Sequence, residues 1–299
     1  MSSIHNVTTA GAGTMGSQVA WQFAFHGKNV TVYDAFEEGI AKGREFHDAF
    51  AREFVEQRGA SDQEVEAAKN RITYTTDLEQ AVADADLVVE QIPEVMALKQ
   101  EFWTKVSKAA PATAILCTNT STMLPSDIGA DVERPERFLS FHFCVKVWEA
   151  NVGEIMMTSK TEEKYFDEVV EFAGEVGLVA VPIKKEQLGY VLNSLLVPFT
   201  IDALKLAAKG IADAPTIDRT WRICMGRVGP MEMADKMGLK TLENRFRVMA
   251  EEAGDAELLL VADYLKTEYV DKGRLGITTG EGFYTYPNPE FAREDFLKV

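Results

Sequence analysis

The N-terminal part of the chain alternates between short apolar runs and longer segments with helical periodicity. Ile4–Thr9 and Asn29–Tyr33 are short and rich in β-branched residues, which predicts strands, and Ser17–His26 between them predicts a helix. The charged segment Phe36–Asn70 has a helical period and a break at residues 59–62, which predicts a helical hairpin. Further apolar runs predict additional strands at Leu87–Glu90, Ala114–Thr118, Phe138–Phe143, Glu154–Met157 and Leu178–Val181.

Strands that alternate with helices favour a parallel, doubly wound sheet. After Pro182 the pattern changes, because the remaining long segments have helical periodicity and no strand pattern interrupts them. The chain is therefore predicted to contain an α/β domain, residues 1–184, followed by an all-helical domain, residues 185–299. The predicted helices are Gln187–Lys209, Ala214–Met225, Pro230–Arg247 and Ala256–Lys272, and Gly276–Pro289 is predicted to be a loop.

The charge balance excludes one class of partner. The 299 residues include 31 Lys and Arg against 47 Asp and Glu, a formal net charge of −16. No basic cluster exceeds the pair Lys184-Lys185, so a nucleic-acid partner is not expected. An anionic ligand must instead depend on local positive features, because the field of the whole protein repels it.

The cysteines and the apolar stretches indicate a compartment. Cys117, Cys144 and Cys224 are widely spaced, which favours reduced thiols and gives no zinc-site pattern, so no metal is expected. Residues 1–16 lack the basic start of a signal peptide. The most apolar segment, Val191–Ile211, includes Pro198 and the charged residues Asp202 and Lys205, and is typical of a core helix. We expect a cytoplasmic protein with no membrane partner.

A glycine-rich turn provides the first candidate site. Residues 11–16 have the pattern G-x-G-x-x-G, directly after a predicted strand and at the start of a predicted helix. In such a turn the first glycine permits the tight bend, the second lets the backbone approach a pyrophosphate, and the third lets the helix pack on the strand. The free N–H groups of the helix N-terminus then bind the anion. The predicted cofactor contacts here are Gly11, Gly13, Thr14, Met15 and Gly16.

An acid at the end of the second predicted strand completes this fingerprint. Asp34 can accept hydrogen bonds from both ribose hydroxyls of a dinucleotide and repels a 2′-phosphate. No arginine follows it in Ala35-Phe36-Glu37, so NAD is preferred to NADP. An acid that merely ends a strand is the simpler interpretation of Asp34, but its place at the end of the strand that follows the glycine turn and helix favours a Rossmann-type dinucleotide site.

Among the four histidines, one lies where chemistry is expected. His5, His26 and His47 are predicted to be structural, whereas His142 lies near the C-terminal end of a predicted strand. Ligands bind at that edge of a doubly wound sheet. Glu154 begins the next predicted strand, and a carboxylate that contacts an imidazole fixes its tautomer and stabilises the imidazolium. Spacing alone supports this pair only weakly.

Several motifs stand in a fixed order along the chain. They are Gly11–Gly16, Asp34, Glu90–Glu94 with Lys99, Thr118–Ser121, Arg137–Phe143, Glu154, Gly189–Asn193, Gly229-Pro230 and Thr279–Tyr284. With them the chain resembles the L-3-hydroxyacyl-CoA dehydrogenase family over nearly its whole length. The resemblance implies NAD-dependent oxidation of a short-chain (S)-3-hydroxyacyl-CoA, or the reverse reaction.

The resemblance also implies a role for each site residue. His142 takes the proton of the 3-hydroxyl group, and Glu154 orients and polarises it. Ser121 binds the substrate oxygen, and Asn193, near a helix start, holds the carbonyl group. Glu94, Lys99 and Asn119 are implied to contact the cofactor, and the helical domain is implied to form a homodimer.

The chain departs from the family pattern at residues that the resemblance places around the substrate and its CoA group. The family usually continues from its histidine as H-F-F-N-P-V, but here residues 142–148 read H-F-C-V-K-V-W. The positions that grip CoA with a serine and a lysine fall on Phe50 and Gln57, although Arg52 or Arg58 could substitute. Trp148 is expected either to line the substrate pocket or to belong to the core.

Two alternatives follow from these departures. One keeps the chemistry and drops CoA, so that the substrate is a free 3-hydroxy acid whose carboxylate pairs with Lys146. The other is a non-catalytic NAD-binding protein. The base, acid and asparagine argue against the second alternative, because binding alone needs none of them.

Overall fold

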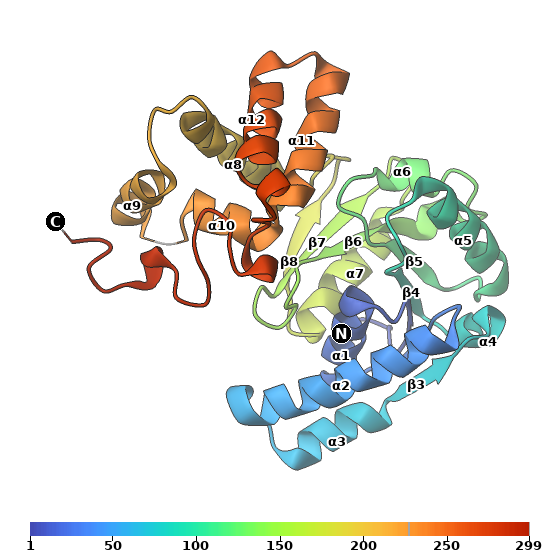
Figure 1. The fold of residues 1–299 in the computed structure, drawn as a ribbon. Coiled ribbons are helices and arrows are strands. Elements are labelled where there is room, and N and C mark those ends of the chain that lie inside the picture. Colours follow the sequence, from blue (N-terminus) through green and yellow to red (C-terminus); the bar gives the residue numbers. More distant parts are fainter. Residues whose placement is uncertain (227, 299) are drawn as a thin grey trace. The chain divides into compact units, whose positions relative to one another are not determined.

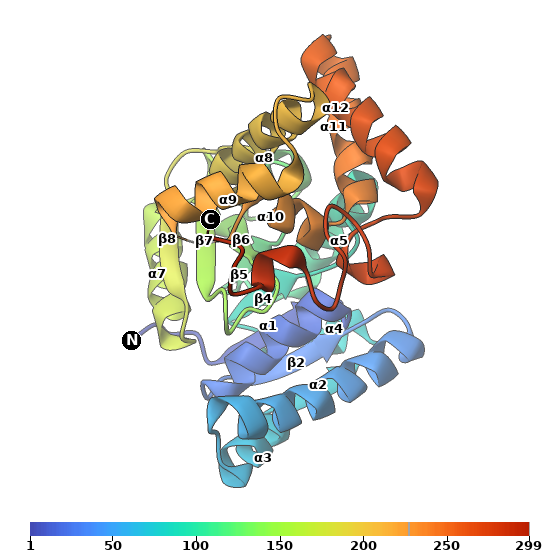
Figure 2. The same ribbon diagram turned by 60° about the vertical axis from the view of Figure 1, so that its left-hand side comes forward.

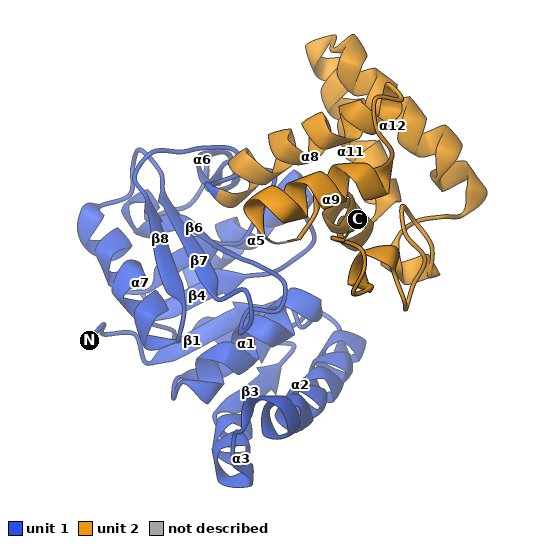
Figure 3. Ribbon diagram, turned by 90° about the vertical axis from the view of Figure 1, so that its left-hand side faces the viewer, with its two compact units in different colours: residues 1–191 blue, residues 192–299 orange. Residues whose placement is uncertain are grey.

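The computed structural model describes residues 1–226 and 228–298, which divide into two compact units, Met1–Val191 and Leu192–Val299 (Figure 3). The sequence places the domain boundary a little earlier, after residue 184. Residues just beyond that point still belong to the first unit through their hydrogen bonds. The Glu186 carboxylate accepts from Ser126 N–H at 2.8 Å, and Val191 N–H donates to Glu154 at 2.9 Å.

One eight-stranded sheet forms the centre of the first unit, with strand order β3-β2-β1-β4-β5-β6-β7-β8 (Figure 1). The structure confirms every predicted strand and adds β3, a short strand that the sequence analysis missed. The strands are β1 Asn6–Ala10, β2 Asn29–Tyr33, β3 Ile72–Thr75, β4 Leu87–Glu90, β5 Ile115–Thr118, β6 Phe138–Phe143, β7 Val152–Met157 and β8 Val179–Ile183.

Helices cover both faces of this sheet. Leu87 and Val89 belong to one apolar cluster and Val88 to another, because successive side chains of a strand point to opposite faces. Side chains of α1, α2, α3 and α7 join the first cluster, and those of α4, α5 and α6 join the second. These helices are α1 Thr14–Phe25, α2 Glu37–Arg58, α3 Asp62–Asn70, α4 Leu78–Val82, α5 Met96–Ala109, α6 Pro125–Ile128 and α7 Glu163–Glu175.

One strand pair corrects the prediction of a parallel sheet. β6 and β7 are antiparallel, whereas every other neighbouring pair in the sheet is parallel. Residues 144–151 join β6 to β7 without a helix, and a parallel return requires a longer crossover. In this register His142 lies directly opposite Glu154.

Helices pack around a separate apolar core in the second unit (Figure 2). The segment predicted as one helix, Pro230–Arg247, is interrupted at Gly238, whose φ of 89° ends the first helix. None of the described helices in the chain is long and apolar enough to cross a membrane. The helices of this unit are α8 Leu192–Ala208, α9 Ala214–Met225, α10 Pro230–Met237, α11 Leu239–Ala253 and α12 Ala256–Glu268.

Candidate active site

The glycine turn after β1 has the geometry that its sequence predicts. Gly11 has a φ of 106°, and a Cβ atom there would lie 2.7 Å from the Gln91 carbonyl oxygen. A Cβ atom on Gly16 would lie 1.7 Å from the Gly11 carbonyl oxygen, so only glycine allows α1 to approach the turn. Gly13, the N-cap of α1, faces open space, and no side chain caps the helix. Its N-terminal N–H groups therefore remain available to an anion.

Asp34 lies beside this turn, at the end of β2. Its Oδ2 accepts a hydrogen bond from Ala12 N–H at 2.9 Å, and its Oδ1 accepts from Phe36 N–H at 3.1 Å. Within the described part of the chain no lysine or arginine forms an ion pair with Asp34. The carboxylate is fixed in place and retains acceptor capacity, as ribose hydroxyl groups require.

A hollow of about 250 Å³ opens at the carboxyl edge of the sheet. It lies where β4 and β5 end and α1 begins, which is the edge that binds ligands in doubly wound folds. The predicted residues Met15, Glu94, Asn119 and Ser121 line it, together with Gln91, Ile92, Thr120 and Thr122.

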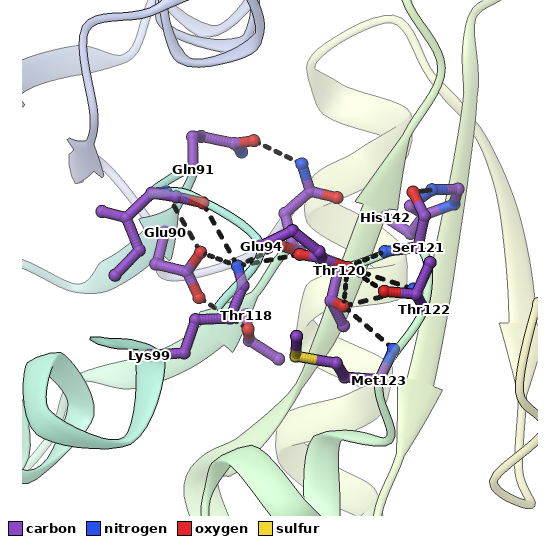
Figure 4. A network of polar contacts seen from close by, with 12 residues as sticks. Glu90, Gln91, Glu94, Lys99, Thr118, Thr120, Ser121, Thr122, Met123 and His142 are labelled. Atoms are coloured by element: carbon purple, nitrogen blue, oxygen red, sulfur yellow. Dashed lines mark hydrogen bonds and ion pairs between the residues drawn. The ribbon is translucent and has the colours of Figure 1, made fainter. Parts of the chain in front are cut away.

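Two amides in the wall of this hollow have unused polar atoms. Asn119 Nδ2 donates to Gln91 Oε1 (Figure 4). Asn119 Oδ1 and Gln91 Nε2 are buried and have no hydrogen-bond partner. A buried acceptor and a buried donor without partners are costly unless a ligand satisfies them. The carboxamide of a nicotinamide ring carries both complementary groups, so these residues fit NAD.

Glu94 shapes the loop that contains Ser121. Its Oε1 accepts hydrogen bonds from Ser121 N–H at 2.9 Å, from Thr122 N–H at 3.1 Å, and from the Thr120 hydroxyl. Burial acts to raise the pKa of Glu94, but the hydrogen bonds and the charge of Lys99 outweigh it and lower that pKa. Glu94 is therefore an anion that holds the serine in place.

Lys99 is fully buried at 0% exposure. Its Nζ donates to Glu90 Oε1 and, at 2.8 Å, to the Asn119 carbonyl oxygen. Glu90 also accepts from Trp103 Nε1 at 3.1 Å and from Thr118 Oγ1 at 2.6 Å, and burial raises its pKa. In this structure Lys99 joins the ends of β4 and β5 beneath the hollow, and its contact with the cofactor stays a prediction.

The predicted catalytic pair is in contact. His142 Nδ1 lies 2.9 Å from Glu154 Oε2, and both side chains are buried. On the other side of the ring, His142 Nε2 lies 2.9 Å from Ser121 Oγ. If Nδ1 carries the proton, it donates to the carboxylate and leaves Nε2 as the acceptor, which is the tautomer that a general base needs. Three of the four predicted catalytic residues thus meet, while Asn193 lies in α8 of the second unit.

Sequence reasoning assigned no role to Tyr190, yet its ring stacks on that of His142 with centroids 4.5 Å apart. The one signal in the sequence was Gly189, because a glycine often marks a place where the backbone takes a positive φ angle. In the structure both Gly189 and Tyr190 have positive φ angles.

Aromatic packing surrounds Phe50 in α2, one of the two positions where the resemblance led us to expect a CoA contact. The Trp148 ring lies 4.9 Å from Phe50 and 5.2 Å from Phe54, measured between centroids. Its Nε1 donates to Glu53 Oε1 at 3.1 Å, and its carbonyl oxygen accepts from Arg58 at 2.9 Å. Trp148 is 6% exposed and belongs to the apolar core, so the structure favours the core interpretation.

Lys146, the predicted partner of a substrate carboxylate, already has partners in the protein. Its Nζ lies 3.3 Å from Glu149 and 3.5 Å from Glu53. The side chain is half-exposed. The structure gives this cation two carboxylates of its own, which disfavours a carboxylate-binding role.

Comparison with protein families gives two matches. The family described as "3-hydroxyacyl-CoA dehydrogenase, NAD binding domain" matches residues 6–187. The family described as "3-hydroxyacyl-CoA dehydrogenase, C-terminal domain" matches residues 189–286.

Individual relatives cover nearly the whole chain. The mitochondrial hydroxyacyl-coenzyme A dehydrogenase of Rattus norvegicus is 32% identical, over 95% of this chain and 91% of its own. A probable 3-hydroxybutyryl-CoA dehydrogenase of Bacillus subtilis is 32% identical, over 95% and 98%. Among solved structures, a diketoreductase described as showing substrate-directed dual catalysis of dicarbonyl compounds is 45% identical. It covers 96% of this chain and 100% of its own, with a TM-score of 0.90.

Proposed function

Because the chain belongs to the 3-hydroxyacyl-CoA dehydrogenase family, we propose that it interconverts a short-chain (S)-3-hydroxyacyl-CoA and the 3-ketoacyl-CoA with NAD. One observation carries this proposal. A buried imidazole lies between a carboxylate and a hydroxyl group at the edge of the sheet, with His142 2.9 Å from both Glu154 and Ser121. Binding of a cofactor alone needs no such base.

Each of the four site residues has its own part in the transfer of the proton or in holding the substrate. In the oxidation direction, His142 Nε2 takes the proton of the 3-hydroxyl group, and Glu154 stabilises the imidazolium that forms. Ser121 Oγ donates a hydrogen bond to the same substrate oxygen, and Asn193 holds the neighbouring carbonyl group. NAD, held at the start of α1 and by Asp34, would supply the hydride acceptor for C3. In the reverse direction the His142 imidazolium returns the proton to the oxygen.

Cofactor binding is assigned to the turn and the hollow. The N–H groups at the start of α1, next to Gly13, bind the pyrophosphate without a basic side chain, which suits a protein with a net charge of −16. Asp34 accepts from the adenosine ribose. Asn119 and Gln91 receive the nicotinamide carboxamide, which satisfies their buried unpaired atoms.

A second candidate keeps this chemistry without CoA and acts on a small 3-hydroxy acid or dicarbonyl compound. The diketoreductase shares 45% identity with this chain, against 32% for the rat and Bacillus relatives. The contact between Phe50 and Trp148 also replaces a polar CoA grip with apolar packing. The occupied Lys146 indicates that recognition of such a substrate does not depend on this cation.

The two candidates differ in one assay. The rate of NADH oxidation is measured with acetoacetyl-CoA, with free acetoacetate and with pentane-2,4-dione at equal concentration, and His142→Gln is the control. Preference for the thioester supports the CoA substrate, whereas preference for either small compound supports the second candidate. If no compound is reduced faster than by His142→Gln, the proposed chemistry is wrong.

We also propose a homodimer formed by the helical unit. Leu195 in α8 is 70% exposed, and Ile223 and Met225 in α9 are also largely exposed. Leu192 in α8 is also exposed and lies three residues before Leu195, so the two side chains share one face of the helix. A contiguous exposed apolar face of this kind is typical of an interface. Light scattering after size exclusion is expected to give about twice the chain mass of 33.2 kDa. The double variant Leu195→Glu with Met225→Glu is expected to give the monomer mass, and a monomeric wild type contradicts the proposal.

For the compartment, we propose the cytoplasm. The three cysteines are unpaired in the structure, which suits a reducing compartment. Cell fractionation tests this assignment, and recovery of the protein in another compartment contradicts it.

A further inference from the structure

Tyr190 lies against the face of the imidazole that the mechanism uses. The centroids of the Tyr190 and His142 rings are 4.5 Å apart, and the planes of the rings differ by only 16°. Tyr190 is 1% exposed, so the phenol ring separates that face of the imidazole from water. The two ring nitrogens of His142 meanwhile contact Glu154 and Ser121 at the ring edge.

The hydroxyl group of Tyr190 is itself held by a hydrogen bond to Ser140 in β6. Ser140 Oγ lies 2.9 Å from the Thr118 carbonyl oxygen and also contacts Tyr190 Oη. Since Ser140 has one hydroxyl proton and donates it to Thr118, Tyr190 donates to Ser140. Burial raises the pKa of Tyr190 far above the physiological range, so it stays neutral and does not exchange protons with the substrate.

The backbone at this position is strained in a way that fixes the ring. Tyr190 has a φ of 55°, a left-handed conformation that is uncommon for a large side chain, and Gly189 before it has a φ of 84°. Immediately afterwards, Val191 N–H donates to Glu154 Oε1 at 2.9 Å. One short segment therefore contacts both members of the dyad. Strain of this kind persists where the surrounding structure holds it, and it concentrates at functional sites.

We propose that Tyr190 is a positioning residue for the general base, with its ring holding the imidazole plane of His142 so that Nε2 faces Ser121 and the substrate hydroxyl. This inference rests on the proposed function. The β6–β7 pair fixes the backbone of His142, but rotation about the Cβ–Cγ bond remains broad for a histidine side chain. A parallel ring on one face restricts that rotation. The electron-rich face of the phenol also attracts the imidazolium that forms when His142 takes the proton.

Two substitutions separate the ring from its hydroxyl group. Tyr190→Phe keeps the stacked ring and loses the bond to Ser140, and we expect its kcat to stay within about threefold of wild type. Tyr190→Leu removes the ring, and we expect a loss of about 10- to 100-fold in kcat, the scale of a misplaced catalytic group. In both variants the dissociation constant of NADH is expected to change little, since no contact assigned to the cofactor is altered.

A spectroscopic readout makes the test independent of turnover. The chain has only four histidines, so histidine labelled with ¹³C at Cε1 gives few signals in an NMR spectrum of the full chain. The His142 signal is assigned by its loss in His142→Gln. Ring current from the stacked phenol shifts the His142 Cε1–H resonance upfield. We expect Tyr190→Phe to keep this shift and Tyr190→Leu to lose it.

A matched control removes a buried aromatic ring elsewhere. Phe172 in α7 is also buried in the first unit and packs on Phe23. Phe172→Leu is expected to lower the melting temperature without changing the His142 resonance or kcat by more than about threefold. The proposal fails if Tyr190→Leu keeps wild-type kcat, or if Phe172→Leu reproduces its effects. If the resonance shifts as expected but no wild-type substrate is found, the positioning holds and the proposed function fails.

Discussion

Replacement of Glu154 by glutamine tests how the dyad makes a base. The two carboxylate oxygens of Glu154 each accept a hydrogen bond, Oε2 from His142 Nδ1 at 2.9 Å and Oε1 from Val191 N–H at 2.9 Å. Glutamine has the same shape but offers one oxygen and one NH₂ group. One of the two donors must therefore face another donor. When that donor belongs to His142, the imidazole shifts its proton to Nε2 and can no longer accept the substrate proton.

The size of the expected loss in kcat follows from the hydrogen bond between His142 and Glu154 that the variant loses. A charge-assisted hydrogen bond to the imidazolium contributes about 1.5–3 kcal/mol, which is roughly a 10- to 150-fold effect at about 1.4 kcal/mol per factor of ten. The wrong tautomer adds to this loss, and the corresponding change in a serine-protease triad lowers kcat by about 10⁴-fold. We expect Glu154→Gln to lower kcat by about 10²- to 10⁴-fold.

The assay follows NADH absorbance at saturating substrate, and fluorescence titration gives the dissociation constant of NADH. We expect that constant to change little in Glu154→Gln and in His142→Gln. The matched control is Glu163→Gln, the same substitution at an exposed glutamate of α7 that pairs with Lys184. A Glu154→Gln enzyme that keeps more than about a tenth of the wild-type kcat refutes this reasoning, because Glu154 then does not polarise the base.

Three further predictions concern the cofactor and stability. Asp34→Ala is expected to raise the dissociation constant of NADH at least about tenfold by removing a charged acceptor, and unchanged affinity in a fluorescence titration contradicts the ribose assignment. Lys99→Met leaves Glu90 as an uncompensated buried charge, so we expect urea denaturation to show that the free energy of unfolding falls by about 3–5 kcal/mol. Adding Glu90→Gln should restore part of this stability, and equal losses in the single and double variants refute the reasoning. Burial lowers the pKa of His47 to about 4 in the folded protein, below its ordinary value of 6.5. Through this difference in pKa, neutral His47 contributes about 3 kcal/mol to the free energy of unfolding above pH 6.5, and this stability is lost as the pH falls to 4. The variant His47→Gln should therefore flatten the dependence of the unfolding free energy on pH in this window.

Local patterns in the sequence predicted most of the secondary structure and the cofactor turn. Strand periodicity and β-branched composition are properties of a few neighbouring residues, so the strands could be predicted before any contact was known. The turn at Gly11 and Gly16 was predictable for the same reason, since its tight geometry depends on glycines at fixed spacing. The short strand β3, Ile72–Thr75, was missed although all four of its residues are β-branched or aromatic, the composition that predicts a strand.

The direction of a strand depends on its connection and its neighbours. The sequence favoured a parallel sheet, but the short loop of residues 144–151 reverses the chain and makes β6 and β7 antiparallel. This reversal places His142 opposite Glu154. The residue types were visible in the sequence, whereas their contact is a consequence of strand register.

Burial and contacts between distant segments were decided by the tertiary structure. The resemblance implied a cofactor contact for Lys99, and only the structure shows that its side chain forms a fully buried ion pair with Glu90. Trp148 packs on α2, and Tyr190, in the stretch of chain that joins β8 to α8, stacks on His142. The sequence by itself determined the elements, the glycine turn and the types of reactive side chain, because these depend on neighbouring residues. The tertiary structure decided which of those side chains meet, because a contact between distant segments depends on how the whole sheet is paired and covered.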